Sequence, residues 1–259
     1  MSTTLKTYQT VSLPEASLQE LYPVPILSYQ WPDGARLAGA LREVILERRY
    51  KTPGVRVSNR GGGWHSENDL QDWSESPVAE LKRRILLMTR EVVLRTTPQA
   101  GREHLEGWQM EAWANVNGFG ASNSSHDHLG GNNMWSGIFY VDAGGVDSSP
   151  ALGGLTKFED RSGVPQATTV GTNPFAREQA IVPETGLMVI FPASLRHYVE
   201  TYRGKNQRMT IAFNLSHTGF VIPTYADQFQ VRRWWWRNFR GVMVGLDRVK
   251  RKLGLGARD

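Results

Sequence analysis

The chain has 259 residues, of which 40% are hydrophobic and 10% aromatic, and such a length and composition indicate one well-buried domain with extensions. Its net charge of +5 is concentrated in residues 221–259, where nine Lys or Arg accompany three Asp, so the basic character is no argument that the core binds nucleic acid. The chain has no cysteine, which excludes disulfides and thiolate ligands, so any bound metal must use imidazole and oxygen ligands.

Two helices are expected in the first part of the chain. Residues 35–49 follow a Pro-Asp-Gly turn and place Leu37, Leu41 and Ile45 at helical spacing. A second helix is expected to begin at Ser76-Pro77, with Ser76 as the capping residue and proline in the first turn. The glycine-rich segment 58–65 between them lacks the lysine of a phosphate loop, and we interpret it as a loop that reaches toward the active site.

From Trp108 onward the sequence changes to short runs of β-branched and aromatic residues separated by Gly, Pro, Asn and Asp. This pattern is typical of a jelly roll. The expected strands are 108–116, 134–141, 152–159, 186–192 and 208–215. We therefore predict a mainly β, cupin-like double-stranded β-helix with N-terminal helices packed on it and a basic C-terminal helix. The expected division is a helical and loop portion at 1–107, the β core at 108–220 and an extension at 221–259.

Two histidines within this β region are candidate metal ligands. Alternate residues of a strand point to the same face, so His126 and His128 can share one cavity while Asp127 points elsewhere. A carboxylate ligand at Asp127 would require a local bulge or turn. By itself a His-x-His pair is a weak signal. A third histidine, His197, follows the apolar strand 187–191.

The strand that begins at Arg208 is expected to direct a charged side chain into the interior of a small barrel. Strict alternation places Arg208, Thr210, Ala212 and Asn214 on one face and the apolar Met209, Ile211 and Phe213 on the other. An arginine that faces into a barrel needs a fixed anion to offset its desolvation, and the guanidinium fork matches a carboxylate. A dicarboxylate such as 2-oxoglutarate is a natural candidate.

Taken in order along the chain, these features resemble a known group, the iron(II)/2-oxoglutarate-dependent oxygenases of bacteria and phages. The similarity spans roughly Tyr22 to Asn214. Its marks are Asn59-Arg60-Gly61-Gly62 with Trp64-His65-Ser66, Trp113 to Asn117, His126-x-His128, Ser136 to Val141, Phe191-Pro192, His197 and Arg208 to Asn214.

The resemblance implies that His126, His128 and His197 bind iron(II), and that Arg208 with Thr210 beside it holds 2-oxoglutarate. Asn115 and Tyr140, on neighbouring strands, are our additional candidates for contacts with this co-substrate. Beyond these metal and co-substrate ligands we expect no separate catalytic residue. His65, His104 and His217 are not expected to be ligands.

The metal ligand set departs from the wider superfamily, which commonly uses two histidines and one carboxylate. The position two after His126 is a histidine here, so a three-histidine triad is the first interpretation. Asp127 as the carboxylate ligand and a two-histidine site completed by water are the alternatives.

The resemblance implies a dioxygenase reaction in which iron(II), 2-oxoglutarate and O2 yield succinate, carbon dioxide and an oxidised substrate. We predict a hydroxylase of an amino-acid, peptide or lipid-linked substrate. One alternative is a three-histidine dioxygenase that does not use 2-oxoglutarate, in which Arg208 would hold a substrate acid. The other is a non-catalytic jelly roll that binds a membrane or a partner.

The C-terminal extension mixes three tryptophans with four arginines at 231–240, and apolar residues then follow at helical spacing as far as Leu253. Residues 231–253 therefore predict a helix docked on the domain or on a second copy in a dimer, or one lying on a membrane surface. Nucleic acid is not an expected partner. Because no apolar run is long enough to cross a bilayer and Met1 to Thr10 do not form a secretion signal, we expect a cytoplasmic protein, with the membrane surface as the alternative location.

Overall fold

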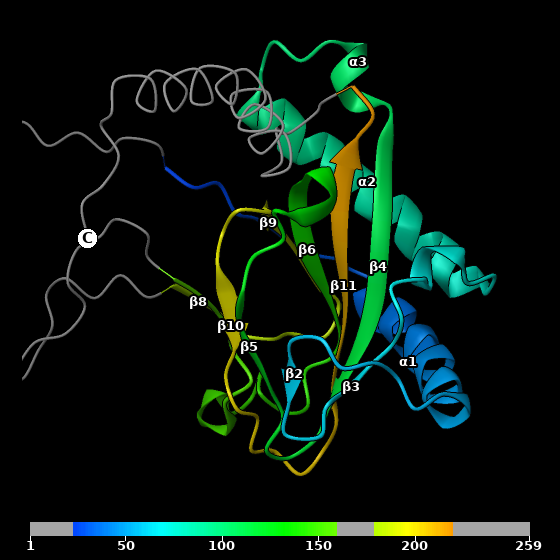
Figure 1. The fold of residues 1–259 in the computed structure, drawn as a ribbon, viewed down its shortest axis with the longest axis vertical. Helices are drawn as coiled ribbons and strands as arrows, with labels where there is room; N and C mark the ends of the chain where they lie inside the picture. The colour runs from blue at the N-terminus through cyan, green and yellow to red at the C-terminus, as the bar shows by residue number, and fades with distance from the viewer. Residues whose placement is uncertain (1–22, 160–178, 220–259) are drawn as a thin grey trace, which may run out of the picture.

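Two antiparallel sheets face each other in the computed structural model, which describes residues 23–159 and 179–219 (Figure 1). The larger sheet has the order β1-β9-β6-β11-β4-β3, and the smaller has the order β2-β5-β10-β7-β8. The strands of the larger sheet are β1 (Leu27–Gln30), β3 (Trp64–His65), β4 (Trp108–Asn117), β6 (Asn133–Asp142), β9 (Leu187–Pro192) and β11 (Arg208–His217). Those of the smaller sheet are β2 (Asn59–Arg60), β5 (Ser122–His126), β7 (Thr156–Phe158), β8 (Gln179–Ile181) and β10 (His197–Val199). The double-stranded β-helix expected from the sequence is confirmed.

Helices α1 (Gly34–Lys51) and α2 (Ser76–Thr96) cover the outer face of the larger sheet, and a single turn, α3 (Arg102–Leu105), precedes β4 (Figure 1). Leu37, Leu41 and Ile45 form the buried stripe of α1, as their spacing predicted. The predicted start of α2 is one residue late, because Ser76, expected to be the capping residue, is the first residue of the helix. Glu75 occupies the capping position without a side-chain hydrogen bond, and Pro77 stands in the first turn.

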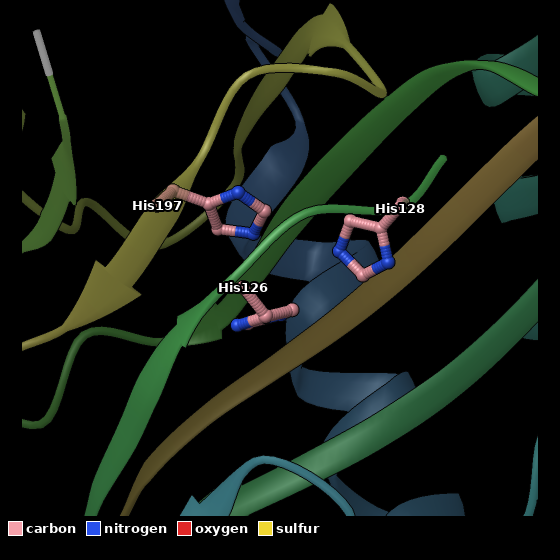
Figure 2. Close-up of side chains that lie close together, drawn as sticks. All are labelled: His126, His128 and His197. Atoms are coloured by element: carbon pink, nitrogen blue, oxygen red, sulfur yellow. The ribbon is translucent and has the colours of Figure 1, made fainter. Parts of the chain in front are cut away.

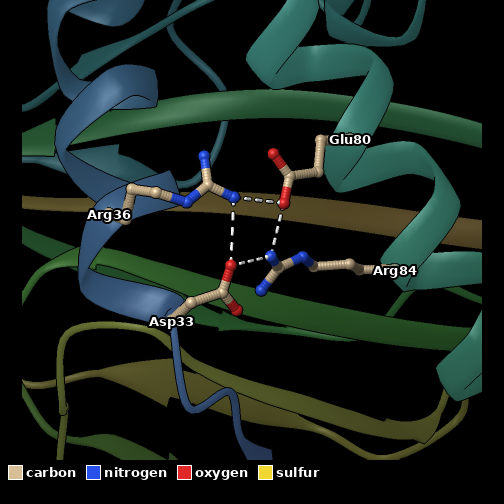
Figure 3. A network of polar contacts seen from close by, with 4 residues as sticks. All are labelled: Asp33, Arg36, Glu80 and Arg84. Carbon is tan, nitrogen blue, oxygen red and sulfur yellow. Dashed lines mark hydrogen bonds and ion pairs between the residues drawn. The ribbon is translucent and has the colours of Figure 1, made fainter.

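An ion-pair network connects the two helices (Figure 3). Nη2 of Arg84 contacts Asp33 Oδ2 at 2.7 Å and also contacts Glu80 Oε1. Nη2 of Arg36 contacts the same two carboxylates at 3.0 and 2.7 Å. The guanidinium of Arg84 also lies 4.7 Å from the centre of the Trp31 ring. The network ties the start of α1 to the middle of α2.

The four inner strands of the larger sheet, β9, β6, β11 and β4, alternate between two surroundings. One set of side chains joins the helices in the main hydrophobic core, and its members on these strands are Ala112, Ala114, Val116, Trp135, Phe139, Val141, Met188, Ile190, Met209, Ile211, Phe213 and Leu215. The intervening residues face the smaller sheet and therefore line the interior of the β-helix. The alternation predicted for Arg208 to Asn214 is the one observed.

Two expectations about the connecting segments need correction. The strand expected at 152–159 is reduced to β7, because Gly153 and Gly154 adopt positive φ angles of 69° and 76° that interrupt an extended strand. The segment 58–65, expected to be a loop, supplies β2 and β3, which pair with β5 and β4. The predicted C-terminal helix lies outside the described residues. No helix within the described ranges combines the length and the apolar character needed to span a bilayer.

Candidate active site

Three histidines from separate positions in the chain meet between the two sheets (Figure 2). Within the described chain, one ligand atom from each of His126, His128 and His197 lies within 4.8 Å of the other two. His126 ends β5 and His197 begins β10, and the two residues are paired across these antiparallel strands. The ring centroids are 4.6 Å apart for His126 and His197, 4.9 Å for His126 and His128, and 5.2 Å for His128 and His197.

Backbone carbonyls orient two of the three imidazoles. Nδ1 of His126 donates to the carbonyl of Ser124 at 2.7 Å, and Nδ1 of His197 donates to that of Leu195 at 2.9 Å. Such a bond fixes the tautomer and leaves Nε2 as the free ligand atom. His128 is held through its backbone instead, since its N–H donates to the Ala193 carbonyl at 2.8 Å and its carbonyl accepts from Asn133 Nδ2 at 3.2 Å.

The surroundings keep these imidazoles neutral. Burial, reinforced by the other two histidines, lowers the pKa of His128 to about 3. Burial and the neighbouring His126 lower the pKa of His197 to about 4, and burial also lowers the pKa of His126. Neutral rings present nitrogen lone pairs at physiological pH. Three imidazole nitrogens suit a divalent transition metal and leave further coordination positions for other ligands.

Asp127 lies outside this group. Its Oδ2 is 3.8 Å from Nη1 of Arg196, and its Oδ1 accepts a hydrogen bond from the backbone of Leu129 at 3.4 Å. Strand β5 ends at His126, so His128 reaches the group from the irregular segment that follows and not from within a strand as predicted. The expected juxtaposition of His126 and His128 is nevertheless the one observed.

The interior face of the larger sheet forms ordered cross-strand rows. Arg208 pairs with Asn117, and Thr210 pairs with both Asn115 and Tyr140. One row further along, Ala212 pairs with Trp113 and Ile138. The Trp113 ring lies 5.7 Å from that of His128, which places the histidines near this row. The four predicted co-substrate contacts, Arg208, Thr210, Asn115 and Tyr140, therefore lie side by side on one face.

Arg208 is 1% exposed and has no carboxylate partner among the described residues. Its guanidinium lies 5.4 Å from the centre of the Tyr140 ring, and its Nε and Nη2 have no hydrogen-bond acceptor. Burial lowers the pKa of Arg208, which is the cost of keeping this cation away from water. Buried N–H groups of a cation without acceptors indicate a site for an anion.

Two residues around Arg208 were not anticipated. Thr156 on β7 is fully buried, and its hydroxyl shares a 2.9 Å hydrogen bond with Tyr140. Gly154 leaves room for the arginine, because a Cβ there would lie 3.1 Å from Arg208 Cδ. His65 is also buried, and it stacks on Trp113 with centroids 5.6 Å apart. It is not among the three clustered histidines.

A double-stranded β-helix with clustered neutral histidines and a buried unpaired arginine fits the class of non-haem metal oxygenases. Residues 111–214 match a family model described as "Putative 2OG-Fe(II) oxygenase". The resemblance found in the sequence is thus confirmed for this region, and the match supports an enzyme of the 2OG-Fe(II) oxygenase class, which uses iron(II), 2-oxoglutarate and O2. The histidine nitrogens and the unpaired Arg208 donors fit the metal and the dicarboxylate of this class.

Comparison with solved structures supports the fold. A prolyl-4-hydroxylase from Pseudomonas putida is 15% identical, with a TM-score of 0.52 over 76% of this chain and 93% of the other. A prolyl hydroxylase from Trichoplax adhaerens, solved with a peptide fragment of a hypoxia-inducible factor degradation domain, is 11% identical. Its TM-score is 0.50 over 75% of this chain and 84% of the other. The comparison with curated proteins gave no match.

Proposed function

We propose that the chain hydroxylates an amino-acid or peptide substrate, with His126, His128 and His197 as iron(II) ligands and Arg208 as the partner of the distal carboxylate of 2-oxoglutarate. Iron(II) and 2-oxoglutarate supply the oxidising chemistry: O2 gives one oxygen atom to succinate, released with carbon dioxide, and the other to a substrate C–H bond. The observation that carries the proposal is the buried Arg208, whose free N–H groups lie on the same interior face as the histidine cluster.

The chain's own residues would position and isolate the co-substrate. Thr210 and Tyr140 lie in the row next to Arg208 and would supply neutral hydrogen bonds to the bound carboxylate, while the unpaired Oδ1 of Asn115 lies in the same row. Burial raises the pKa of Tyr140, so its hydroxyl keeps its proton and can donate. Ile138, Val189 and Phe191 form an apolar cluster on this interior, and such a wall excludes bulk water from the reacting groups.

The decisive experiment is anaerobic addition of iron(II) and 2-oxoglutarate to the full chain, followed by visible spectroscopy. The proposal expects the charge-transfer band of the iron chelate in the wild type. Arg208→Ala should raise the concentration of 2-oxoglutarate needed for half of this band by about a hundredfold, because a charge-assisted pair in a buried site is lost. The amount of iron bound should not change.

Arg203→Ala is the matched control, since Arg203 is an exposed arginine five residues before Arg208. It should leave both the band and the iron content at their wild-type values. An iron-loaded, folded protein without the band would overturn the proposal. Oxygen consumption that does not depend on 2-oxoglutarate would then favour the alternative three-histidine dioxygenase, in which Arg208 holds a substrate acid.

A lipid-linked substrate depends on residues 231–253, which lie outside the described residues. The proposal for this segment rests on its sequence, in which Trp234, Trp235 and Trp236 stand among arginines. Co-sedimentation of the full chain with anionic vesicles tests it, with replacement of the three tryptophans by alanine as the comparison. Equal sedimentation of the two proteins would remove the membrane interpretation and leave the docked helix or the dimer contact.

A further inference from the structure

One more polar row crosses the interior face of the larger sheet beyond the histidines, on the side opposite Arg208. Asn214 of β11 pairs with Glu111 of β4 and with Ser136 of β6. Ser136 in turn pairs with Phe191, whose ring lies 4.8 Å from that of His197. Glu111 is two residues from Trp113, whose ring lies near His128. The row is therefore adjacent to the proposed metal ligands.

Hydrogen bonds join this row into a continuous chain of side chains. Ser136 Oγ donates to Asn214 Oδ1 at 2.8 Å, and Asn214 Nδ2 donates to Glu111 Oε2 at 3.4 Å. From the other side, Asn68 Nδ2 donates to Glu111 Oε1 at 3.0 Å. Both oxygens of Glu111 are thus held by neutral amides, which fix the direction of the carboxylate without neutralising its charge.

The row lies at the open end of the β-helix. Along the interior positions of β11, Arg208 and Thr210 are 1% and 4% exposed, whereas Ala212 and Ser216 are partly exposed. Glu111 and Asn68 are exposed, while Ser136 and Asn214 are buried. A co-substrate on Arg208 would occupy the closed end, so a substrate would approach the metal ligands past Glu111.

The charge of Glu111 is not balanced within the described part of the chain. Two carboxylates next to strands of the smaller sheet have cationic partners, since Glu159 contacts Arg196 Nε at 3.1 Å and Glu200 contacts Lys157 Nζ at 2.7 Å. Among the described residues no cation contacts Glu111, and its carboxylate oxygens accept hydrogen bonds from the two amides. An oriented, solvent-accessible carboxylate without a counterion is suited to bind a cation.

We infer that Glu111, oriented by Asn68 and Asn214, is a specificity-determining residue that binds an ammonium or guanidinium group of the substrate. This inference rests on the proposed function and narrows its substrate to a cationic amino acid or a basic side chain of a peptide. The hydroxylated carbon then lies within a side-chain length of the cationic group, because the row of Glu111 is adjacent to the histidines.

The test uses the full chain loaded anaerobically with iron(II) and 2-oxoglutarate, titrated in a calorimeter with arginine and with its neutral isostere citrulline. The same pair is then used as N-acetyl amides, which separates a free amino acid from a peptide as the source of the cation. In one of the two pairs, the free amino acids or the N-acetyl amides, the cationic probe should bind about tenfold more tightly than the neutral probe. Added salt should reduce this preference, because Glu111 is exposed.

Glu111→Gln should abolish the preference, and Glu111→Lys should reverse it. Glu67→Gln, which removes an exposed carboxylate on the segment that carries Asn68, should leave the preference unchanged. Equal binding of cationic and neutral probes by the wild type, absence of binding at millimolar concentration, or a preference retained in Glu111→Gln would each overturn the inference. The charge-transfer band, recorded in the same samples, reports the proposed iron and 2-oxoglutarate sites independently of the probes.

Discussion

His126 and His197 face each other across two neighbouring antiparallel strands, with their ring centroids 4.6 Å apart and each Nδ1 bound to a carbonyl two residues earlier in the chain. The strand pairing and these two local hydrogen bonds determine where both rings point. His128 is different, because it reaches the cluster from the irregular segment after β5 and its position depends on hydrogen bonds of its backbone to other segments.

The first prediction concerns which neighbour of His126 completes the metal site. His128→Ala should weaken iron(II) binding by at least about a hundredfold, since it removes one of three clustered nitrogens. Asp127→Ala should leave iron binding nearly unchanged, because this carboxylate is directed toward Arg196. Iron content after anaerobic loading and gel filtration measures both. Loss of iron in the Asp127 variant with retention in the His128 variant would establish Asp127 as the ligand.

The second prediction concerns Tyr140, whose phenol bonds to Thr156 and whose ring lies beside Arg208. Tyr140→Phe keeps the ring but removes the hydroxyl, so the Kd for 2-oxoglutarate should rise about tenfold while iron binding is retained. Tyr202→Phe is the comparison, since its buried hydroxyl donates to the Gly144 carbonyl at 2.6 Å and is thereby occupied. It should lower thermal stability without a comparable change in Kd. Equal Kd changes in the two variants would contradict a direct role for Tyr140.

The third prediction uses two glycines that share a backbone conformation but not a neighbour. Gly154 and Gly145 have φ angles of 76° and 87°, so alanine is strained at both. A Cβ at Gly154 would meet Arg208 Cδ at 3.1 Å, whereas at Gly145 the nearest atom is 3.8 Å away. Gly154→Ala should therefore weaken 2-oxoglutarate binding clearly more than Gly145→Ala, with similar losses of stability. Titration of the charge-transfer band and thermal unfolding measure the two effects, and similar binding in both variants would argue against a tight fit around Arg208.

Parts of the fold with a long repeating pattern could be predicted from the sequence. The residues of β11 from Arg208 to Asn214 alternate between the two faces, so the shared face of Arg208 and Thr210 follows from strand geometry. The buried stripe of α1 is equally regular. The histidine cluster was found because its members lie on or beside strands that flank recognisable turns, and the family resemblance then supplied their expected roles.

Other features depend on contacts between distant segments and leave little trace in the sequence. Strands β2 and β3 have two residues each, which is too short for an alternation pattern, so the burial of His65 was not foreseen. Thr156 becomes important only because β7 faces Tyr140 across the interior. Glu111 looks like an ordinary surface carboxylate until the register of β4 and β11 places it beside Asn214.

The last prediction concerns the ion-pair network between α1 and α2 (Figure 3). The side chain of Arg84 is 4% exposed and lies on Trp31, whereas that of Arg36 is 60% exposed, although both contact Asp33 and Glu80. Arg84→Ala should lower the free energy of unfolding by about 2 kcal/mol, because packing and a cation–π contact are lost with the ion pairs. Arg36→Ala should cost clearly less, since exposed pairs contribute little. Urea unfolding at neutral pH measures both.

The same network makes stability depend on pH in a defined direction. The guanidinium of Arg84, followed by that of Arg36, lowers the pKa of Asp33, and Arg36 with Arg84 lowers the pKa of Glu80. A carboxyl group whose pKa is lowered in the folded state contributes stability that is fully present above its ordinary value, 3.8 for Asp33 and 4.5 for Glu80. This contribution is lost as the pH falls below those values. Urea unfolding at neutral pH and at about pH 3 should therefore show a smaller acid-induced loss in Arg84→Ala than in the wild type. Equal losses in the two proteins would mean that other carboxylates govern acid stability.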